Sequence, residues 1–243
     1  MKGKHLIRII FATVFAAGAC FSQHAWQLND GETFESEFVK VLGREALFRG
    51  ADGRNVKVPL DQFSPESRRL IELEKPPELE FSFVNISDKK IFPAGINEKT
   101  QRPAEMRCLY GVKIKQRSAG KYNYELKLEL FVIGQERLGD KYILLDSNEA
   151  DFLLPEENGR RFEFRSDREV VLQNYTDNDD IRGEKYYGFL AIVTDERGEE
   201  VGMRASHDWL YENIGNLRNL SINNYMDDAC LRTFPTRPKS TRY

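Results

Sequence analysis

Few of the residues on which most enzyme sites depend occur in this chain. Its 243 residues include 3 histidines and 3 cysteines, and only His24 and His207 follow the first 22 residues. A nucleophilic triad needs a histidine beside the nucleophile, and two histidines do not by themselves build the usual zinc hydrolase site. No Walker loop or dinucleotide-binding fingerprint occurs. We therefore predict a protein that is not an enzyme, with no catalytic residues, no metal site and no cofactor.

Neither sign of charge dominates the composition. The net charge is −3 at pH 7, so the chain lacks the excess of basic residues that is typical of nucleic-acid-binding proteins. One local exception is a C-terminal segment with four basic residues and no acidic one, namely Arg232, Arg237, Lys239 and Arg242. Its prolines predict a basic, irregular tail over 225–243. We expect this tail to be solvated, with attraction to an anionic surface as the alternative.

Only one long apolar run occurs, at 9–19, and it is shorter than the roughly 20 residues that a membrane span needs. Basic residues precede the run, and Ala17-Gly18-Ala19 follows the small-x-small rule of signal peptidase. We therefore predict a signal peptide over 1–22 and export of the chain, to a periplasmic or extracellular location.

Cys20 directly follows this small-residue stretch. The arrangement resembles a bacterial lipoprotein box, in which the cysteine becomes the lipidated first residue, although that pattern prefers leucine where Ala17 stands. Lipid attachment at Cys20 and ordinary cleavage between Cys20 and Gln23 remain alternatives. A lipid anchor is the only membrane contact expected.

The other two cysteines, Cys108 and Cys230, are separated by most of the second half of the chain. Exported proteins meet an oxidising compartment, where paired cysteines usually bridge. We therefore predict a disulfide between Cys108 and Cys230, which would tie the C-terminal tail to the domain; two buried free thiols are the alternative.

Residues 24–74 have the pattern of a small β module. Alternating strands are expected over 33–41, 46–49 and 56–60, with a hairpin turn at Asp52-Gly53. Ser64-Pro65-Glu66 then has the composition of a helix start. We expect that helix to end near Glu74, before a proline-rich linker over 75–78.

This module resembles the Sla-homology domain family (SHD). The residues that carry the resemblance are Trp26, Asp30-Gly31, Phe34, Glu37-Phe38-Val39, Asp52-Gly53, Val56, Val58-Pro59-Leu60 and Phe63-Ser64. Bacterial members commonly follow a signal peptide. The resemblance implies a five-stranded, SH3-like barrel closed by a short helical turn. In eukaryotic endocytic adaptors the related domain binds peptides and proteins.

From residue 79 to 224 the chain alternates repeatedly, and most clearly over 124–132. Further strands are expected over 79–84, 107–115, 141–145, 161–164, 169–172, 185–194 and 200–205. Leu210, Ile214 and Leu217 recur at helical spacing after Ser206, a candidate N-cap. We therefore predict a mainly β protein, in which the small SH3-like barrel precedes an Ig-like antiparallel β-sandwich with a C-terminal helix over one end. The second part is similar to companion domains found beside bacterial SHD modules, a group without an assigned activity.

These observations favour a binding protein whose β modules contact protein partners in the cell envelope, in an adaptor or structural role. The alternative is a carbohydrate- or calcium-dependent surface binder, with Tyr175, Tyr186, Tyr187 and Trp209 as candidate contacts that core packing could also explain. The acidic turn Asp177–Asp180 resembles half a calcium loop but lacks the glycine and glutamate of an EF-hand. A hydrolase with a carboxylate pair stays open, because acidic residues are abundant.

Overall fold

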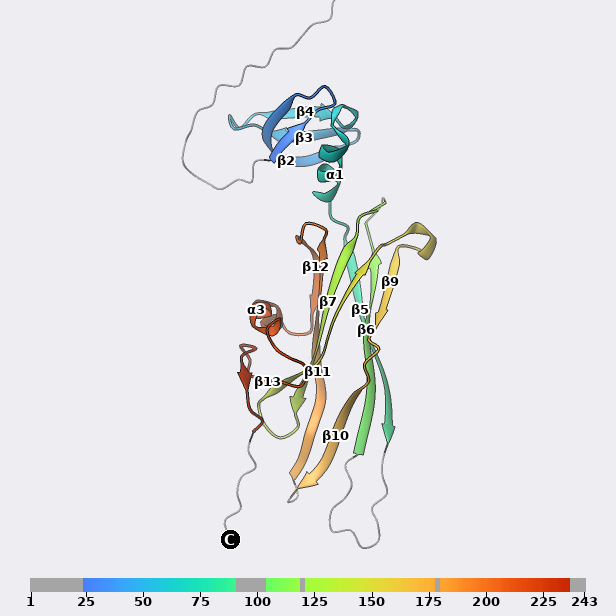
Figure 1. Ribbon diagram of the computed structural model, residues 1–243, viewed down its shortest axis with the longest axis vertical. Coiled ribbons are helices and arrows are strands. Elements are labelled where there is room, and N and C mark those ends of the chain that lie inside the picture. Colours follow the sequence, from blue (N-terminus) through green and yellow to red (C-terminus); the bar gives the residue numbers. More distant parts are fainter. Residues whose placement is uncertain (1–23, 91–103, 119–120, 178–179, 237–243) are drawn as a thin grey trace, which may run out of the picture. The chain divides into compact units, whose positions relative to one another are not determined.

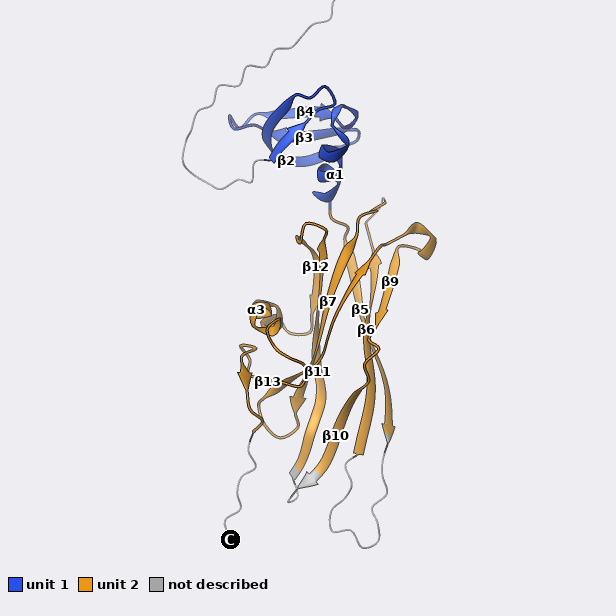
Figure 2. Cartoon of the chain, viewed as in Figure 1, with its two compact units in different colours: residues 1–75 blue, residues 76–243 orange. Residues whose placement is uncertain are grey.

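The computed structural model describes residues 24–90, 104–118, 121–177 and 180–236 (Figure 1). The expected signal peptide and Cys20 lie outside these residues. The chain divides into two compact units, Met1–Lys75 and Pro76–Tyr243, and the division falls within the expected linker over 75–78 (Figure 2). Both units consist of antiparallel strands with few helices, so the predicted mainly β class is confirmed.

The first unit contains a four-stranded sheet followed by a helix. Its strands are hydrogen-bonded in chain order, β1-β2-β3-β4. The elements are β1 (His24–Gln27), β2 (Thr33–Leu42), β3 (Glu45–Arg49), β4 (Asn55–Pro59), the 3-10 turn η1 (Leu60–Gln62) and α1 (Pro65–Leu73). The described part of this unit therefore has four strands, whereas the resemblance implies five. A bridge between Leu28 and Phe63 brings the chain after η1 back to the end of β1.

Aromatic residues fill the core of the first unit. Trp26, Phe48 and Phe63 are fully buried, and Phe34 and Phe38 pack against them. The indole Nε1 of Trp26 donates a hydrogen bond of 2.9 Å to the backbone oxygen of Ser36, which satisfies its one polar group.

The helix α1 begins where the sequence predicts. The Oγ of Ser64 accepts a 3.2 Å hydrogen bond from the backbone nitrogen of Ser67, and Pro65 occupies the first turn. Ser67 is buried, and its own Oγ accepts a 2.8 Å bond from the backbone nitrogen of Gln27. Ser67 therefore links the first turn of α1 to β1.

The described part of the second unit contains ten strands, one 3-10 turn between β8 and β9, and two short α-helices between β12 and β13. Its elements are β5 (Leu79–Lys90), β6 (Ala104–Gln116), β7 (Leu126–Glu136), β8 (Tyr142–Phe152), η2 (Glu156–Asn158), β9 (Arg161–Arg165), β10 (Val170–Asp177), β11 (Asp180–Asp195), β12 (Glu200–Ala205), α2 (Asp208–Glu212), α3 (Ile214–Leu217), β13 (Tyr225–Met226) and β14 (Arg232–Thr233). The hydrogen-bonded order is β14-β13-β8-β7-β11-β10-β6-β5, with β12 on β11 and β9 on β6.

This order folds into two layers because β11 contributes to both. Residues 180–183 pair with β10, whereas residues 184–195 pair with β7. At the change, Gly183 has φ +107°, and a Cβ there would lie 1.7 Å from the backbone oxygen of Gln173, so only glycine fits. The layers meet through stacked rings, with the centroids of Phe83 and Phe189 4.4 Å apart.

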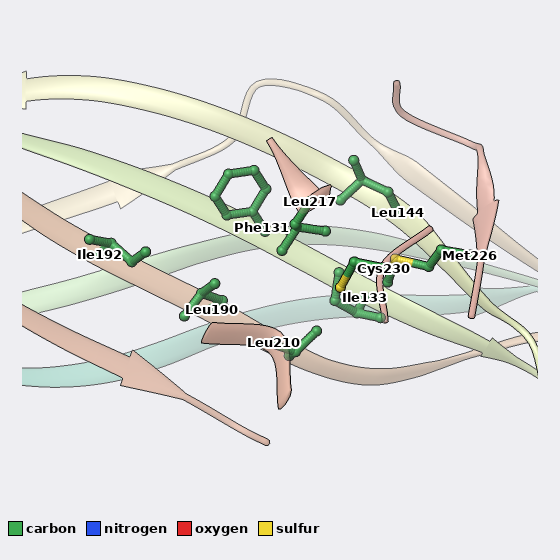
Figure 3. Packing of buried hydrophobic residues seen from close by; sticks show 9 residues of the cluster. All are labelled: Phe131, Ile133, Leu144, Leu190, Ile192, Leu210, Leu217, Met226 and Cys230. Atoms are coloured by element: carbon green, nitrogen blue, oxygen red, sulfur yellow. The ribbon is translucent and has the colours of Figure 1, made fainter. Parts of the chain in front are cut away.

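The C-terminal part of the chain covers the outer face of the β7-β8-β11 layer. Phe189 faces the other layer, so the neighbouring Leu190 points outward, where Leu210 of α2 and Leu217 of α3 bury it (Figure 3). Figure 1 shows α3 and β13 on one side of β7 and β11, and β5 and β6 on the other. The helical segment therefore covers a sheet face and not an end of the sandwich.

Two further details of the helical segment differ from the prediction. The helix is interrupted at Asn213, and its N-cap is His207, which makes no side-chain cap bond. Ser206 instead accepts a 3.0 Å bond at its Oγ from the backbone nitrogen of Phe189. The predicted N-cap hydroxyl thus ties the loop before α2 to β11.

The predicted irregular tail is wrong over residues 225–233, and the predicted disulfide is wrong; residues 237–243 of the tail lie outside the described part. Residues 225–233 contain β13 and β14, and Met226 and Cys230 are buried in the core of the second unit. Cys108 and Cys230 are both free. Cys230 packs in the hydrophobic cluster on the outer face. Cys108 lies on β6, opposite Ser87 of β5 on one side and Val170 of β10 on the other. The two thiols therefore lie in different parts of the core, and side chains directed to different layers cannot meet within bonding distance.

Candidate functional site

The four candidate aromatic residues do not form one surface. Tyr187 and Trp209 come together, and Tyr142 and His207 join them. Tyr186 points into the sandwich, and Tyr175 lies apart on β10. We call the group Tyr142, Tyr187, His207 and Trp209 the aromatic cluster.

A β-bulge in β11 creates this arrangement. Tyr186 pairs with Gly134 and Gly188 pairs with Ile133, so Tyr187 is an extra residue in β11. In a regular strand Tyr187 would share a face with Phe189, two residues later, and would point into the sandwich. The bulge reverses this alternation, so Tyr186 points inward and Tyr187 outward.

The rings of the aromatic cluster lie close to one another and come from three segments. The Tyr187 ring stacks on His207 with centroids 4.3 Å apart and an interplanar angle of 21°. The Tyr142 ring of β8 lies 4.8 Å from both Tyr187 and Trp209. All four side chains are partly exposed. The cluster packs against the core beneath α2, so a rigid layer supports it.

The phenol of Tyr142 is neutral at physiological pH. Burial, a hydrogen bond with the Tyr187 side chain and the nearby carboxylates of Asp228 and Asp140 together raise its pKa to about 12. Tyr142 and Tyr187 can therefore offer hydroxyl groups as donors and acceptors beside apolar ring faces. Such a surface combines apolar contact with polar specificity.

The Tyr186 ring stacks against rings of the other layer and is not part of the aromatic cluster, although its side chain is partly exposed. Its ring stacks with Phe83 at 5.3 Å and with Tyr110 at 5.8 Å. Burial raises the pKa of its phenol, and a hydrogen bond with Ser206 partly offsets this. Tyr175 is 41% exposed, and no ring of the aromatic cluster is within stacking range of it among the described residues.

Two members of the aromatic cluster, Tyr142 and His207, are absent from the sequence-based candidates. Tyr142 lies in a predicted strand and His207 next to a predicted helix start. The sequence separation of Tyr142 and His207 from Tyr187 does not predict a contact between the rings, because the contacts depend on the bulge and on where α2 packs. The glycine at position 188 is the one feature of the sequence that relates to the contact between Tyr187 and His207. A Cβ there would lie 2.9 Å from the Cβ of Ser206 and 3.1 Å from Cδ2 of His207.

A separate polar group lies inside the second unit. Asp146 follows a second bulge, in β8 opposite Val132 and Ile133, and only 1% of its side chain is exposed. The Arg168 guanidinium lies 3.8 Å from Oδ1 of Asp146 and donates bonds to the backbone oxygen of Leu145 and to Oδ1 of Asn223. This group joins the β9–β10 loop, β8 and the C-terminal cover, which is a structural role.

Among the described residues, no group of three or more histidine, cysteine, aspartate or glutamate side chains could hold a metal ion. The turn Asp177–Asp180 includes residues 178 and 179, which lie outside the described part. Within the described residues, no helix is long and apolar enough to cross a membrane.

No protein-family model, no curated protein and no solved structure matches this chain.

Proposed function

We propose that this chain is an exported, non-enzymatic protein whose β units bind protein partners in the cell envelope, with the aromatic cluster as the main contact of the second unit. The observation that carries the proposal is the cluster itself. Tyr142, Tyr187 and Trp209 are partly exposed, lie within 4.8–6.4 Å of one another and rest on a rigid core. Tyrosine and tryptophan dominate the binding energy of protein interfaces.

The physical reason is that these rings supply a large contact area at little cost in entropy. Each side chain has few rotatable bonds, and here the neighbouring rings already restrict them. The phenol hydroxyls lie at the polar ends of the rings, where a partner's backbone groups can pair with them. Preorganised contacts of this kind lose less freedom on binding than mobile side chains.

We also propose that the first unit is an SHD-like, SH3-like module and that it supplies a second contact surface. Its support is the set of residues that resembles the family, together with the order of four antiparallel strands followed by a capped helix. Export is supported by the N-terminal residues alone. An intact mass of the protein isolated from its native envelope tests both cleavage and lipidation, since a diacylglyceryl group on Cys20 adds a characteristic mass.

The test of partner binding is a cross-linked pull-down of the tagged mature chain from its native envelope, read by mass spectrometry. Tyr187→Ala and Trp209→Ala should each weaken capture of a reproducible envelope protein by about 10-fold or more, as for a truncated interface hot spot. Tyr175→Ala is the matched control, because Tyr175 is an exposed tyrosine outside the aromatic cluster. Circular dichroism should show that all three variants keep the fold.

Loss of capture in the Tyr175 variant as well, or equal capture by all variants, would contradict the assignment of the aromatic cluster. A chain that folds and recovers no envelope protein would contradict protein binding itself.

A second candidate is carbohydrate binding, which the same cluster favours. Sugars stack on aromatic faces while their hydroxyls bind carboxylates, and Asp140 and Asp228 lie near the Tyr142 phenol. A glycan array with and without a chelator separates this candidate from the first. Binding to one glycan class that Trp209→Ala abolishes would favour the carbohydrate, and sensitivity to the chelator would favour a calcium-dependent mode.

A further inference from the structure

The strand β5 forms a free edge of the second unit. It stands at the end of the hydrogen-bonded order, and among the described residues β6 is the one strand with which it pairs. β5 has 12 residues, and its register with β6 runs without a bulge. The other side of such a strand presents a row of unpaired backbone N–H and C=O groups, which is a template for a further strand.

Other edge strands in the described part of the second unit have features that discourage pairing. β14 has 2 residues and β9 has 5. β12 has 6 residues, and its register with β11 shifts after Val193. The part of β8 beyond β13 carries the acidic residues Glu149 and Asp151. In β5, by contrast, residues 81–87 contain no charged residue and no proline, so this edge lacks the usual protection.

The backbone groups of the odd-numbered residues of β5 point to the free edge. The backbone nitrogen of Arg117 donates a 2.7 Å hydrogen bond to the oxygen of Glu78, directly before the paired residues Leu79 and Gln116. Hydrogen-bonded and non-hydrogen-bonded pairs alternate along an antiparallel ladder. The even-numbered residues of β5 therefore bond β6, and the N–H and C=O groups of the odd-numbered residues from 81 to 89 face outward.

Two apolar side chains lie beside this edge, on the outer face of its layer. Phe83 faces the other layer, where its ring stacks on Phe189, so Val84 and Ile86 lie on the opposite face. Ile86 is 45% exposed. A strand added to β5 would place its own side chains next to Val84 and Ile86 and would cover them.

We propose that two copies of this chain pair through β5, antiparallel and related by a two-fold axis at Asn85. The two Asn85 residues then lie opposite each other and exchange backbone hydrogen bonds. Val84 of each copy lies opposite Ile86 of the other, which brings apolar side chains together. Ser82 lies opposite Asp88, and its hydroxyl can donate to that carboxylate. The pairing leaves neither copy of β5 with a free edge, so the assembly closes at two copies.

The neighbouring symmetric registers are less favourable. An axis at Val84 would place Glu80 opposite Asp88, and like charges directly opposite each other are destabilising. An axis at Ile86 would place Val84 opposite Asp88, an apolar side chain against a carboxylate. The sequence of β5 is thus complementary to itself in the register centred on Asn85, and this self-complementarity identifies the partner as a second copy of the chain.

The test is sedimentation velocity of the mature chain over a series of concentrations, in which we expect a monomer–dimer equilibrium. Asn85→Pro removes an outward N–H that makes no bond to β6, and it should lower the association constant by about tenfold or more. Ile86→Lys should have a similar effect, because it replaces the apolar neighbour of Val84. Ile181→Lys is the matched control, since Ile181 is 61% exposed on β11, which does not pair with β5. It should stay within about twofold of the unmodified chain.

A pair of substitutions in one chain tests whether the two strands are copies of each other. Ser82→Asp places two carboxylates opposite each other and should lower the association constant by about threefold or more. Adding Asp88→Ser to the same chain exchanges the two groups, so the association constant should return toward that of the unmodified chain. A foreign strand on this edge would give no such rescue.

A cysteine at the axis tests the register directly. The Cα atoms of a hydrogen-bonded pair lie about 5.5 Å apart, within the range of about 4.4–6.8 Å that a disulfide spans. Asn85→Cys should therefore form a covalent dimer on oxidation. Ser82→Cys, on the same strand, is the control: Ser82 lies opposite Asp88, so the two new cysteines would be about 20 Å apart and should not bridge. This pair of variants reports on the register even if the proline variant fails to fold.

Four results would overturn the proposal. The first is a monomer at every concentration. The second is a dimer that Asn85→Pro and Ile86→Lys leave intact while circular dichroism shows the native fold, which would place the contact on another surface. The third is an open-ended polymer, because a two-fold contact closes. The fourth is a monomeric chain that captures another protein in a manner sensitive to Asn85→Pro, which would assign this edge to a foreign strand.

Discussion

Tyr186 and Tyr187 are neighbours in the chain, yet their rings belong to opposite faces of the same strand. The Tyr186 ring stacks on Phe83 between the two layers, with centroids 5.3 Å apart, and the Tyr187 ring stacks on His207 in the aromatic cluster at 4.3 Å. Adjacent residues of any strand alternate, but the bulge decides which of the two points inward. One extra residue in β11 therefore supplies an interior ring and a surface ring together.

The close approach of β11 to the start of α2 depends on Gly188. Gly188→Ala should lower the free energy of unfolding by about 1–3 kcal/mol, because the new methyl group meets Ser206 and His207 at 2.9 Å and 3.1 Å. Gly215→Ala is the control, since no atom lies within 4 Å of a Cβ there. It should be neutral or stabilising by up to about 1 kcal/mol through helix propensity. Chemical denaturation measures both, and equal effects of the two substitutions would contradict the close contact.

Arg168 should stabilise the buried Asp146. Arg168→Met should lower the free energy of unfolding by about 2–4 kcal/mol, because it leaves a carboxylate that is 1% exposed without its cation. Asp146→Asn removes the charge, so the double variant should cost less than the sum of the single variants by about 1 kcal/mol or more. A double-mutant cycle by urea denaturation measures this coupling. Strictly additive effects would mean that Arg168 acts through Leu145 and Asn223 alone.

Cys108 and Cys230 should be unreactive thiols. Burial raises the pKa of Cys108, and burial together with Asp227 and Asp228 raises the pKa of Cys230 to about 11. At pH 8 both are thus protonated as well as shielded, and the thiolate is the reactive form. Ellman's reagent should label neither until the protein is unfolded, and dithiothreitol should leave the Tm unchanged. Ser82→Cys, at an exposed position of β5, should react at once; an intact mass 2 Da below that of the dithiol would show that the thiols pair after all.

The fold should be lost at alkaline pH through its buried tyrosines. Burial is the main cause that raises the pKa of five phenols: Tyr110, Tyr122, Tyr142, Tyr186 and Tyr225. The values for Tyr122 and Tyr142 are about 12, against about 10 in an unfolded chain. The stability that these groups contribute is fully present below about pH 10 and is lost as the pH rises toward about 12, because the unfolded state then releases protons that the folded state retains.

An absorbance titration at 295 nm beside circular dichroism checks this alkaline transition. We expect one set of tyrosines to ionise near pH 10 and a second set only as the fold is lost. Ionisation of all tyrosines near pH 10 with the fold intact would contradict the burial of these phenols.

Local sequence patterns predicted most strands correctly. The alternation over 124–132 corresponds to β7, and the segment 200–205 corresponds to β12 in full. The strand expected over 185–194 corresponds to β11, which pairs with both β7 and β12. These predictions were correct because the burial pattern of a strand follows from the alternation of apolar and polar residues along a few consecutive positions. Ser64 predicted the start of α1 for the same reason, since a cap bonds a residue three positions away.

The errors arose where distant segments meet. The C-terminal residues 225–233 have short strands and buried side chains only because the outer face of β7, β8 and β11 is apolar and needs a cover. The predicted disulfide failed because Cys108 and Cys230 belong to different layers of the core, which spacing along the chain does not reveal.

The sequence by itself determined the class of the protein: mainly β, two units, a capped helix near the end of the first unit and a basic C-terminal segment without acids. Only the tertiary structure decided which aromatic residues are on the surface and that the C-terminal segment holds Phe234 out in solvent. The physical reason is one of range. Alternation and capping act over a few residues, whereas a bulge, a covered sheet face and a bond such as that between Thr236 and Glu136 depend on residues as many as 100 positions apart.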